Sequence, residues 1–184
     1  MKTKIFLAAF IILISSASFS QEAPEPAAKI LEKAYKQAAK EKKNVFVIFH
    51  ASWCGWCRKM EASLNDPSCS EYFQRSYVLV HLTVLENGDL KKTENPGAED
   101  MFKKYAGDKS GIPFFLIFDK KGKLLADSQI RKEGEGLDKP GKNMGCPAAD
   151  DEVAVFVGIL RKTSKITDAE TAAVTDRFRK NNSH

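Results

Sequence analysis

The spacing of apolar residues along the chain predicts helices that alternate with strands. Residues 27–42 place apolar side chains at helical intervals with Lys and Glu on the opposite face, which is typical of an amphipathic helix. Residues 45–49 are an unbroken run of Val, Phe and Ile, and such a run indicates a strand that is buried on both faces. We predict similar strands at 77–85 and 114–118.

The segments between and after these strands predict further helices and loops. In chain order they are a loop at 51–55, helices at 57–64 and 68–75 separated by the breaker 65–67, a polar loop at 86–96 and a helix at 97–105. Residues 119–122, Asp-Lys-Lys-Gly, predict a hairpin turn into a returning strand at 123–128. A glycine-rich loop at 131–145 leads to a helix opened by Pro147, and Thr167 caps a last helix.

The order of elements predicts an α/β fold. Alternating strands and helices favour a parallel sheet with helices on both faces, and the hairpin adds an antiparallel strand at its edge, so we expect a central mixed sheet. The 184 residues suffice for one core, and no repeat marks a second domain. We expect one domain over 27–184, ending in a C-terminal helical extension, after a short linker at 21–26.

Residues 1–20 have the pattern of a secretory signal peptide. Early lysines give a positive start, and the apolar run at 5–14 is too short to span a bilayer as a helix. Small polar residues precede Gln21, where we expect cleavage. The mature protein would then be periplasmic or secreted, without stable membrane insertion. A retained membrane anchor is the alternative.

The charge pattern argues against nucleic acid as a partner. The chain has 29 Lys and Arg and 24 Asp and Glu, which gives a formal net charge of +5. The lysines are interleaved with acids, as in 40–43, whereas nucleic-acid binders usually gather them on one face. We therefore expect a solvated surface and no nucleic-acid binding.

A Cys-x-x-Cys motif lies where the first predicted strand turns into a helix, in the sequence Trp53-Cys54-Gly55-Trp56-Cys57. A helix N-terminus carries partial positive charge and unpaired N–H groups, so it lowers the pKa of a cysteine placed there. The thiolate is the form that attacks a disulfide. We expect Cys54 to be this nucleophile, and Cys57, more buried one turn later, to attack the mixed disulfide and release the product.

A zinc site is the main alternative for two cysteines at this spacing. Zinc needs two more ligands close by in the sequence, and the remaining cysteines, Cys69 and Cys146, are isolated. We therefore expect no metal and no organic cofactor, because the two cysteines of the motif carry the electrons themselves.

Two segments resemble the thioredoxin superfamily. Residues 45–60, which include the first strand and the motif, resemble that family's active-site strand and loop. Residues 111–118, Gly-Ile-Pro-Phe-Phe-Leu-Ile-Phe, resemble its second signature, in which the proline is cis and faces the disulfide. The resemblance covers roughly 27–162, is nearest to exported bacterial thioredoxin-like proteins, and implies a thioredoxin fold.

The resemblance also implies which residues meet a substrate. The N–H and C=O of Ile112 would pair with an extended substrate strand, because a cis Pro113 turns the backbone towards it. Trp53, Gly55 and Trp56 surround the cysteines and would contact the same strand. An ordinary trans proline that opens a strand is the alternative for Pro113.

The chain departs from the family at the proton acceptor. Thioredoxins carry a buried aspartate at the position of Ile48, where it helps to deprotonate the second cysteine. His81, near where the family often has a lysine, and His50 are candidates to accept the proton of Cys57; a packed or surface histidine is the alternative for each. Gly-Trp replaces Gly-Pro between the cysteines, and two loops look longer than in the minimal fold.

The thioredoxin-like topology also places the two isolated cysteines. The strand at 123–128 would run parallel to the strand that precedes Cys54, so the helix opened after Cys146 would begin at the same end of the sheet. Cys69 would lie towards the opposite end, which disfavours a Cys69–Cys146 disulfide. Cys146 is then either a small apolar residue at a helix start or an accessory thiol.

These inferences predict an exported thiol–disulfide oxidoreductase. We favour a reductase or isomerase over an oxidase, because no basic residue lies between the cysteines. Its partners would be protein disulfide substrates and a redox partner of unknown identity. The alternatives are a non-catalytic binding or chaperone module built on the same fold and a dedicated partner in cytochrome maturation.

Overall fold

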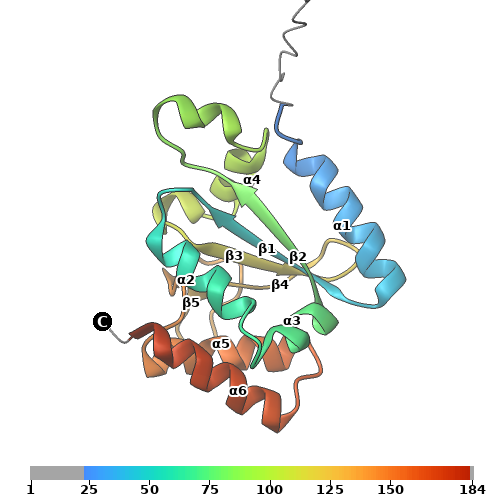
Figure 1. Ribbon diagram of the computed structural model, residues 1–184, viewed down its shortest axis with the longest axis vertical. Coiled ribbons are helices and arrows are strands. Elements are labelled where there is room, and N and C mark those ends of the chain that lie inside the picture. Colours follow the sequence, from blue (N-terminus) through green and yellow to red (C-terminus); the bar gives the residue numbers. More distant parts are fainter. Residues whose placement is uncertain (1–22, 183–184) are drawn as a thin grey trace, which may run out of the picture.

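The computed structural model describes residues 23–182, so the expected signal peptide at 1–20 and the first part of the linker lie outside the described residues. A four-stranded sheet in the order β2-β1-β3-β4 forms the centre (Figure 1). Its strands are β1 (Asn44–His50), β2 (Tyr77–Thr83), β3 (Phe114–Phe118) and β4 (Leu124–Asp127). Between residues 23 and 182, no helix is long and apolar enough to cross a membrane.

The sheet is mixed, as expected. The alternation of strands and helices favoured a β3 parallel to β1, which is wrong, whereas the thioredoxin-like topology used to place Cys146 implied an antiparallel β3. β1 and β2 are parallel, whereas β3 is antiparallel to both β1 and β4. The antiparallel pairing therefore begins in the middle of the sheet and not only at its edge. β4 consequently runs parallel to β1, which confirms the topology used to place Cys146.

The strand register gives the direction of β3. The chain passes from β2 to β3 through η1 (Gly88–Thr93), α4 (Ala98–Lys104) and η2 (Gly107–Lys109). Phe114, the first residue of β3, pairs with Phe49 near the end of β1, and Thr83 at the end of β2 pairs with His50. β3 therefore starts at the edge of the sheet where β2 ends and runs back along β1.

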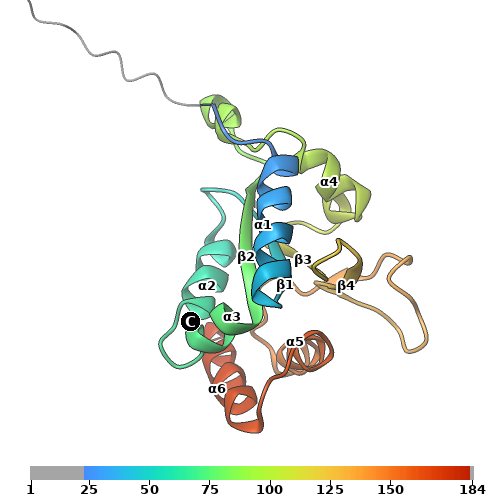
Figure 2. The same cartoon turned by 90° about the vertical axis from the view of Figure 1, so that its right-hand side faces the viewer.

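The helices cover both faces of the sheet. α1 (Ala27–Glu41) and α4 pack on one face, and α2 (Gly55–Leu64), α3 (Ser70–Ser76), α5 (Asp150–Thr163) and α6 (Asp168–Arg179) pack on the other. Figure 2 shows α2 and α4 on opposite sides of β2. In β1, Val45, Val47 and Phe49 belong to the core under α1, and Phe46 and Ile48 to the core under α2 and α5. This alternation confirms a strand that is buried on both faces.

The C-terminal helices differ slightly from their predicted bounds. The helix expected to open at Pro147 begins at Asp150, because Ala149 is its N-cap and the Glu152 carboxylate accepts the N–H groups of Ala148 and Ala149. Thr167 caps α6 as predicted, with its Oγ1 accepting the N–H of Glu170 at 3.2 Å. α6 ends in η3 (Lys180–Asn182).

The loop expected at 131–145 is ordered by a small second sheet and a buried ion pair. β5 (Gln129–Ile130) pairs with β6 (Lys142–Asn143), which brings the end of the loop back towards its start. Arg131 donates from Nη1 and Nη2 to the two carboxylate oxygens of Asp127, at 2.7 and 2.6 Å. These contacts hold the loop so that the residues after β6 lie beside the sheet end that carries Cys54.

Candidate active site

Cys54 and Cys57 form a disulfide at the N-terminus of α2, with an S–S distance of 2.01 Å. Cys54 is the N-cap residue, and the backbone N–H of Cys57 donates to the Cys54 Sγ at 3.1 Å. The prediction that Cys54 occupies the helix start is confirmed. In the reduced protein the same N–H and the helix N-terminus lie where they can stabilise a thiolate on Cys54.

The expectation that Cys57 is the more buried cysteine is wrong. Cys54 is 3% exposed and Cys57 is 7% exposed. Ile112 packs against the pair, and its carbonyl oxygen lies 3.7 Å from the Cys54 Sγ. Cys57, by contrast, borders a cavity on the other side of the disulfide. Both cysteines are therefore buried in the oxidised state, but the residues that surround Cys54 differ from those that surround Cys57.

The second signature lies directly beside the disulfide. The Ile112–Pro113 peptide bond is cis, as predicted, and Ile112 packs on the cysteines. This leaves the backbone of Ile112 next to Cys54, where the resemblance expects a substrate strand. Contact of Pro113 itself with the disulfide stays a prediction.

Asn143, in β6, holds the residues around the cis proline in place through hydrogen bonds to their backbone. Sequence reasoning missed it. Its Nδ2 donates to the carbonyl oxygens of Ser110, Gly111 and Pro113 at 3.2, 3.1 and 3.1 Å, and its Oδ1 accepts the N–H of Gly145 at 3.1 Å. These partners are backbone atoms that the loop fold brings to Asn143, so no side-chain motif in the sequence signals its role.

The two tryptophans and Gly55 present an open surface around the disulfide. Trp53 is 51% exposed and Trp56 is 48% exposed. The Trp53 Nε1 donates to the Leu85 carbonyl at 2.7 Å, which fixes the ring. A Cβ on Gly55 would meet only the Arg58 guanidinium, at 3.8 Å, so the surface there is free of bulk. Apolar rings on either side of an uncovered backbone suit contact with an extended polypeptide.

Cys146 lies on the active-site side of the domain, as predicted. It lines a cavity of about 200 Å³ together with Trp56, Ile112 and Pro113. Cys69 lies elsewhere, with its Sγ 3.2 Å from the Ser63 carbonyl oxygen, at the far end of α2. Neither cysteine is in a disulfide, so the expected absence of a Cys69–Cys146 bridge is confirmed.

Burial makes both isolated cysteines poor nucleophiles. It raises the pKa of Cys146 to about 12 and also raises the pKa of Cys69. We expect iodoacetamide at mildly alkaline pH to alkylate Cys54 in the reduced native protein and to leave Cys69 and Cys146 unmodified, because only the thiolate reacts. Peptide mass mapping, with the urea-unfolded protein as the control in which all four cysteines react, checks this. Rapid native alkylation of Cys146 would support the accessory thiol instead.

A cavity of about 330 Å³ lies on the Cys57 side of the disulfide. Its walls include Cys57, Ile48, His50, Glu61 and His81. The structure thus places both candidate histidines beside Cys57 and an apolar residue where thioredoxins have an aspartate. The His81 Nε2 lies 2.6 Å from the Glu61 Oε2, and sequence reasoning missed Glu61 as a functional residue.

The two histidines differ in their surroundings. Their rings meet edge to face with centroids 5.7 Å apart. Burial lowers the pKa of His50, and the neighbouring His81 lowers it further. Within residues 23–182, no group of three or more His, Cys, Asp or Glu side chains is arranged to hold a metal ion.

Glu86 is a buried carboxylate that holds the active-site loop, and sequence reasoning missed it as well. Its Oε1 accepts the backbone N–H of Ser52 at 2.6 Å, and its Oε2 accepts the Ser52 hydroxyl at 2.7 Å. Glu86 immediately follows the predicted strand at 77–85. In a parallel pair the ends of the two strands lie side by side, so the sequence could have indicated that Glu86 lies close to the motif.

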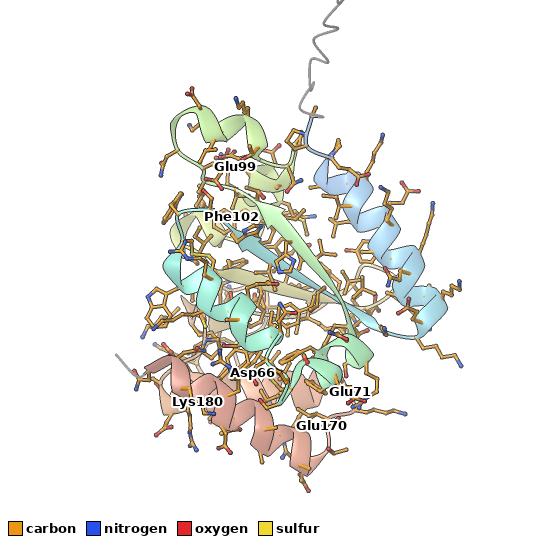
Figure 3. All side chains as sticks on the ribbon, viewed as in Figure 1. Asp66, Glu71, Glu99, Phe102, Glu170 and Lys180 are labelled. Carbon is orange, nitrogen blue, oxygen red and sulfur yellow. A yellow bond between two sulfur atoms is a disulfide. The ribbon has the colours of Figure 1, made fainter. Side chains whose placement is uncertain are left out.

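We expect Glu86→Ala to cost about 1–3 kcal/mol of stability, because it removes a buried carboxylate that accepts two hydrogen bonds from Ser52. Urea unfolding measures this cost. Glu99→Gln is the matched control, because Glu99 lies on α4 in an exposed pair with Lys103, and we expect it to change stability by less than about 1 kcal/mol (Figure 3). Equal effects of the two variants would show that Glu86 does not hold the loop.

Comparison with known proteins agrees with the fold. A family model described as thioredoxin-like matches residues 27–120. This match includes the motif at 53–57 and the cis proline.

Solved structures of thioredoxin-fold proteins are similar at low identity. The disulphide isomerase from Xylella fastidiosa Temecula1 is 18% identical with a TM-score of 0.46, over 85% of this chain and 92% of that one. A thioredoxin from Thermus thermophilus is 18% identical with a TM-score of 0.42, over 76% and 84%. The C-terminal domain of DsbD from Neisseria meningitidis, in its oxidised form, is 22% identical with a TM-score of 0.39, over 57% and 84%.

Proposed function

The chain belongs to the thioredoxin-like family, and on this premise we propose that it is an exported thiol–disulfide oxidoreductase that acts on protein disulfides. The observation that carries the proposal is the Cys54–Cys57 disulfide at the N-terminus of α2, with the Cys57 N–H on the Cys54 Sγ and the Ile112 carbonyl 3.7 Å away. This arrangement combines a stabilised thiolate with a backbone edge that can hold a substrate strand.

The reaction proceeds in two exchanges. The Cys54 thiolate attacks one sulfur of a substrate disulfide, forms a mixed disulfide and expels the other substrate sulfur as a thiolate. Cys57 then loses its proton and attacks the Cys54 Sγ, which restores the Cys54–Cys57 disulfide and releases the second substrate thiolate. Two electrons pass from the protein to the substrate, and the steps reverse when the protein oxidises a dithiol.

The direction and the compartment belong to the proposal. Gly55 and Trp56 add no positive charge next to the Cys54 thiolate, which supports a reductase or isomerase over an oxidase. The lysine-initiated apolar run before Gln21 supports export to the periplasm or secretion. The substrates are proteins with accessible disulfides, and a separate redox partner returns the pair to its reduced state.

Two assays test the proposed activity. The protein with dithiothreitol is expected to accelerate the reduction of insulin, and the reduced protein is expected to restore activity to scrambled ribonuclease if it isomerises disulfides. The control is the variant in which both Cys54 and Cys57 are replaced by serine, which should match buffer alone. Wild-type rates equal to the control would contradict the oxidoreductase and favour the binding or chaperone module, particularly if both proteins suppress aggregation of a reduced client.

Export is tested separately in a Gram-negative host. We expect cell fractionation to find the protein in the periplasm and N-terminal sequencing to start at Gln21, because signal peptidase cleaves after small residues at this spacing. An intact N-terminus in the membrane fraction would instead show a retained anchor.

A further inference from the structure

The second exchange needs a base, and the cavity beside Cys57 contains one. The thiolate and not the thiol attacks the mixed disulfide, so the Cys57 proton must leave first. Ile48, which lines the cavity, cannot accept it. Ile48 is the register partner of His81 in the parallel β1–β2 pair, so the two side chains lie on the same face of the sheet, the face that α2 covers.

Glu61 is the carboxylate that lies against the His81 ring. The Glu61 Oε2 lies 2.6 Å from the His81 Nε2. Among the described residues the Nε2 forms no hydrogen bond, so the contact acts through charge and does not fix which ring nitrogen carries the hydrogen. When the ring takes a proton, its positive charge lies beside the carboxylate.

His50 is less suited to hold the proton. Its Nε2 lies 3.5 Å from the Thr83 hydroxyl. Burial and the neighbouring His81 lower its pKa, so its charged form is disfavoured. Among residues 23–182 no carboxylate forms an ion pair with its ring, whereas Glu61 lies against His81. The charged and titratable groups that line the cavity with His81 are His50 on β1 and Cys57, Arg58 and Glu61 on α2, and Glu86 after β2 acts on His50.

We propose that His81 is the proton acceptor for Cys57 and that Glu61 is the residue that positions it. The inference rests on the proposed function and adds the groups that control its second step. The Cys57 thiol gives its proton to a ring nitrogen of His81 across the cavity of about 330 Å³, which is wide enough to hold the water that links them.

Atoms and electrons balance in this step. The Cys57 S–H bond breaks and an N–H bond forms on His81. The Cys57 thiolate bonds to the Cys54 Sγ, the bond from Cys54 to the substrate sulfur breaks, and the substrate leaves with the electron pair. His81 then passes its proton to solvent through the open side of the cavity, because its side chain is 35% exposed.

Stopped-flow kinetics with substoichiometric dithiobis(nitrobenzoate) separate the two exchanges. The first coloured thiolate reports the attack by Cys54, and the second reports the resolution by Cys57. At neutral pH we expect His81→Gln to slow the second release about 100-fold and Glu61→Gln to slow it about 10-fold, with the first release unchanged within about twofold. Glu71→Gln is the matched control, because Glu71 is exposed on α3, away from the cavity, and we expect it to leave both releases unchanged (Figure 3).

Two further readouts distinguish proton transfer from a structural role. The defect of His81→Gln should shrink as pH rises, because hydroxide then deprotonates Cys57 directly. Added imidazole should accelerate the second release in His81→Ala and have no effect in wild type. The pH dependence is also expected for Glu61→Gln, which tests the inference if His81→Gln fails to fold, since Glu61 lies half exposed on the surface of α2.

A second release that is unchanged in His81→Gln and in Glu61→Gln, or slowed by the same factor at every pH, would overturn the inference and leave the proposed function intact. Loss of the first release in the wild-type protein would instead contradict the proposed function itself. The phase that fails therefore identifies the claim that fails.

Discussion

Cys57→Ser is expected to convert the protein into a trap that stays covalently bound to its substrates, whereas Cys54→Ser is expected to abolish exchange. The reason is the position of Cys54 as the N-cap of α2, where the helix N-terminus and the Cys57 N–H stabilise its thiolate. Without Cys57 the mixed disulfide has no internal thiol to resolve it. Non-reducing electrophoresis after incubation with insulin, followed by peptide mass mapping, measures the trapped complex.

The control for this prediction is Cys146→Ala, which removes a third cysteine near the same surface. We expect it to exchange at the wild-type rate, because burial raises the pKa of that thiol to about 12. Trapping by Cys54→Ser, with the substrate attached to Cys57, would reverse the assignment of the two roles.

Arg131→Ala is expected to destabilise the fold by about 3–5 kcal/mol, because it leaves the carboxylate of Asp127 buried without its cation. The two side chains are 8% and 2% exposed and form two hydrogen bonds of 2.7 and 2.6 Å. Urea unfolding measures the change in stability. Loss of the Arg131–Asp127 ion pair should also make the loop that carries Asn143 less ordered. Because Asn143 holds the backbone around the cis proline, insulin turnover should fall as well.

Two variants bracket this expectation. Arg161→Ala breaks an exposed ion pair with Asp168 and should cost less than about 1 kcal/mol. The double variant Arg131→Met with Asp127→Leu removes both charges and should be more stable than Arg131→Ala alone, because no buried charge is left unpaired. A cost of Arg131→Ala no larger than that of Arg161→Ala would show that the buried pair does not anchor the loop.

Local patterns were sufficient to predict most of the fold. The apolar runs at 45–49 and 114–118 are strands because each is buried on both faces, helical spacing revealed α1 and α5, and the Thr167 cap revealed α6. The direction of β3 could not be predicted in the same way. It depends on how far the η1–α4–η2 connection carries the chain, and hydrophobic periodicity contains no information about that distance.

The active site was predicted where its chemistry lies in contiguous motifs. Cys54, Cys57 and the cis Pro113 belong to short sequences that resemble a known family, and the structure packs Ile112, the residue before the cis proline, on the two cysteines. Asn143 holds the site through backbone atoms that are distant in sequence, so its partners were visible only in three dimensions. The proximity of Glu86 to the motif could have been inferred from its place after the adjacent strand, but its bonds to Ser52 could not. The burial of Cys54 was misjudged for the same reason, since Ile112 is the residue that covers it.

Transfer of electrons from the Cys54–Cys57 pair to a protein disulfide is the central claim, and acid-quench mass mapping measures it most directly. Reduced protein is mixed with insulin, and samples are quenched with acid at intervals and alkylated. The mass of the peptide that contains both Cys54 and Cys57 is then measured by mass spectrometry. The account predicts that this peptide becomes disulfide-linked in step with the appearance of reduced insulin chains, and that Cys69 and Cys146 remain thiols throughout. A Cys54–Cys57 pair that stays reduced while insulin is reduced, or insulin that stays intact, would contradict the account.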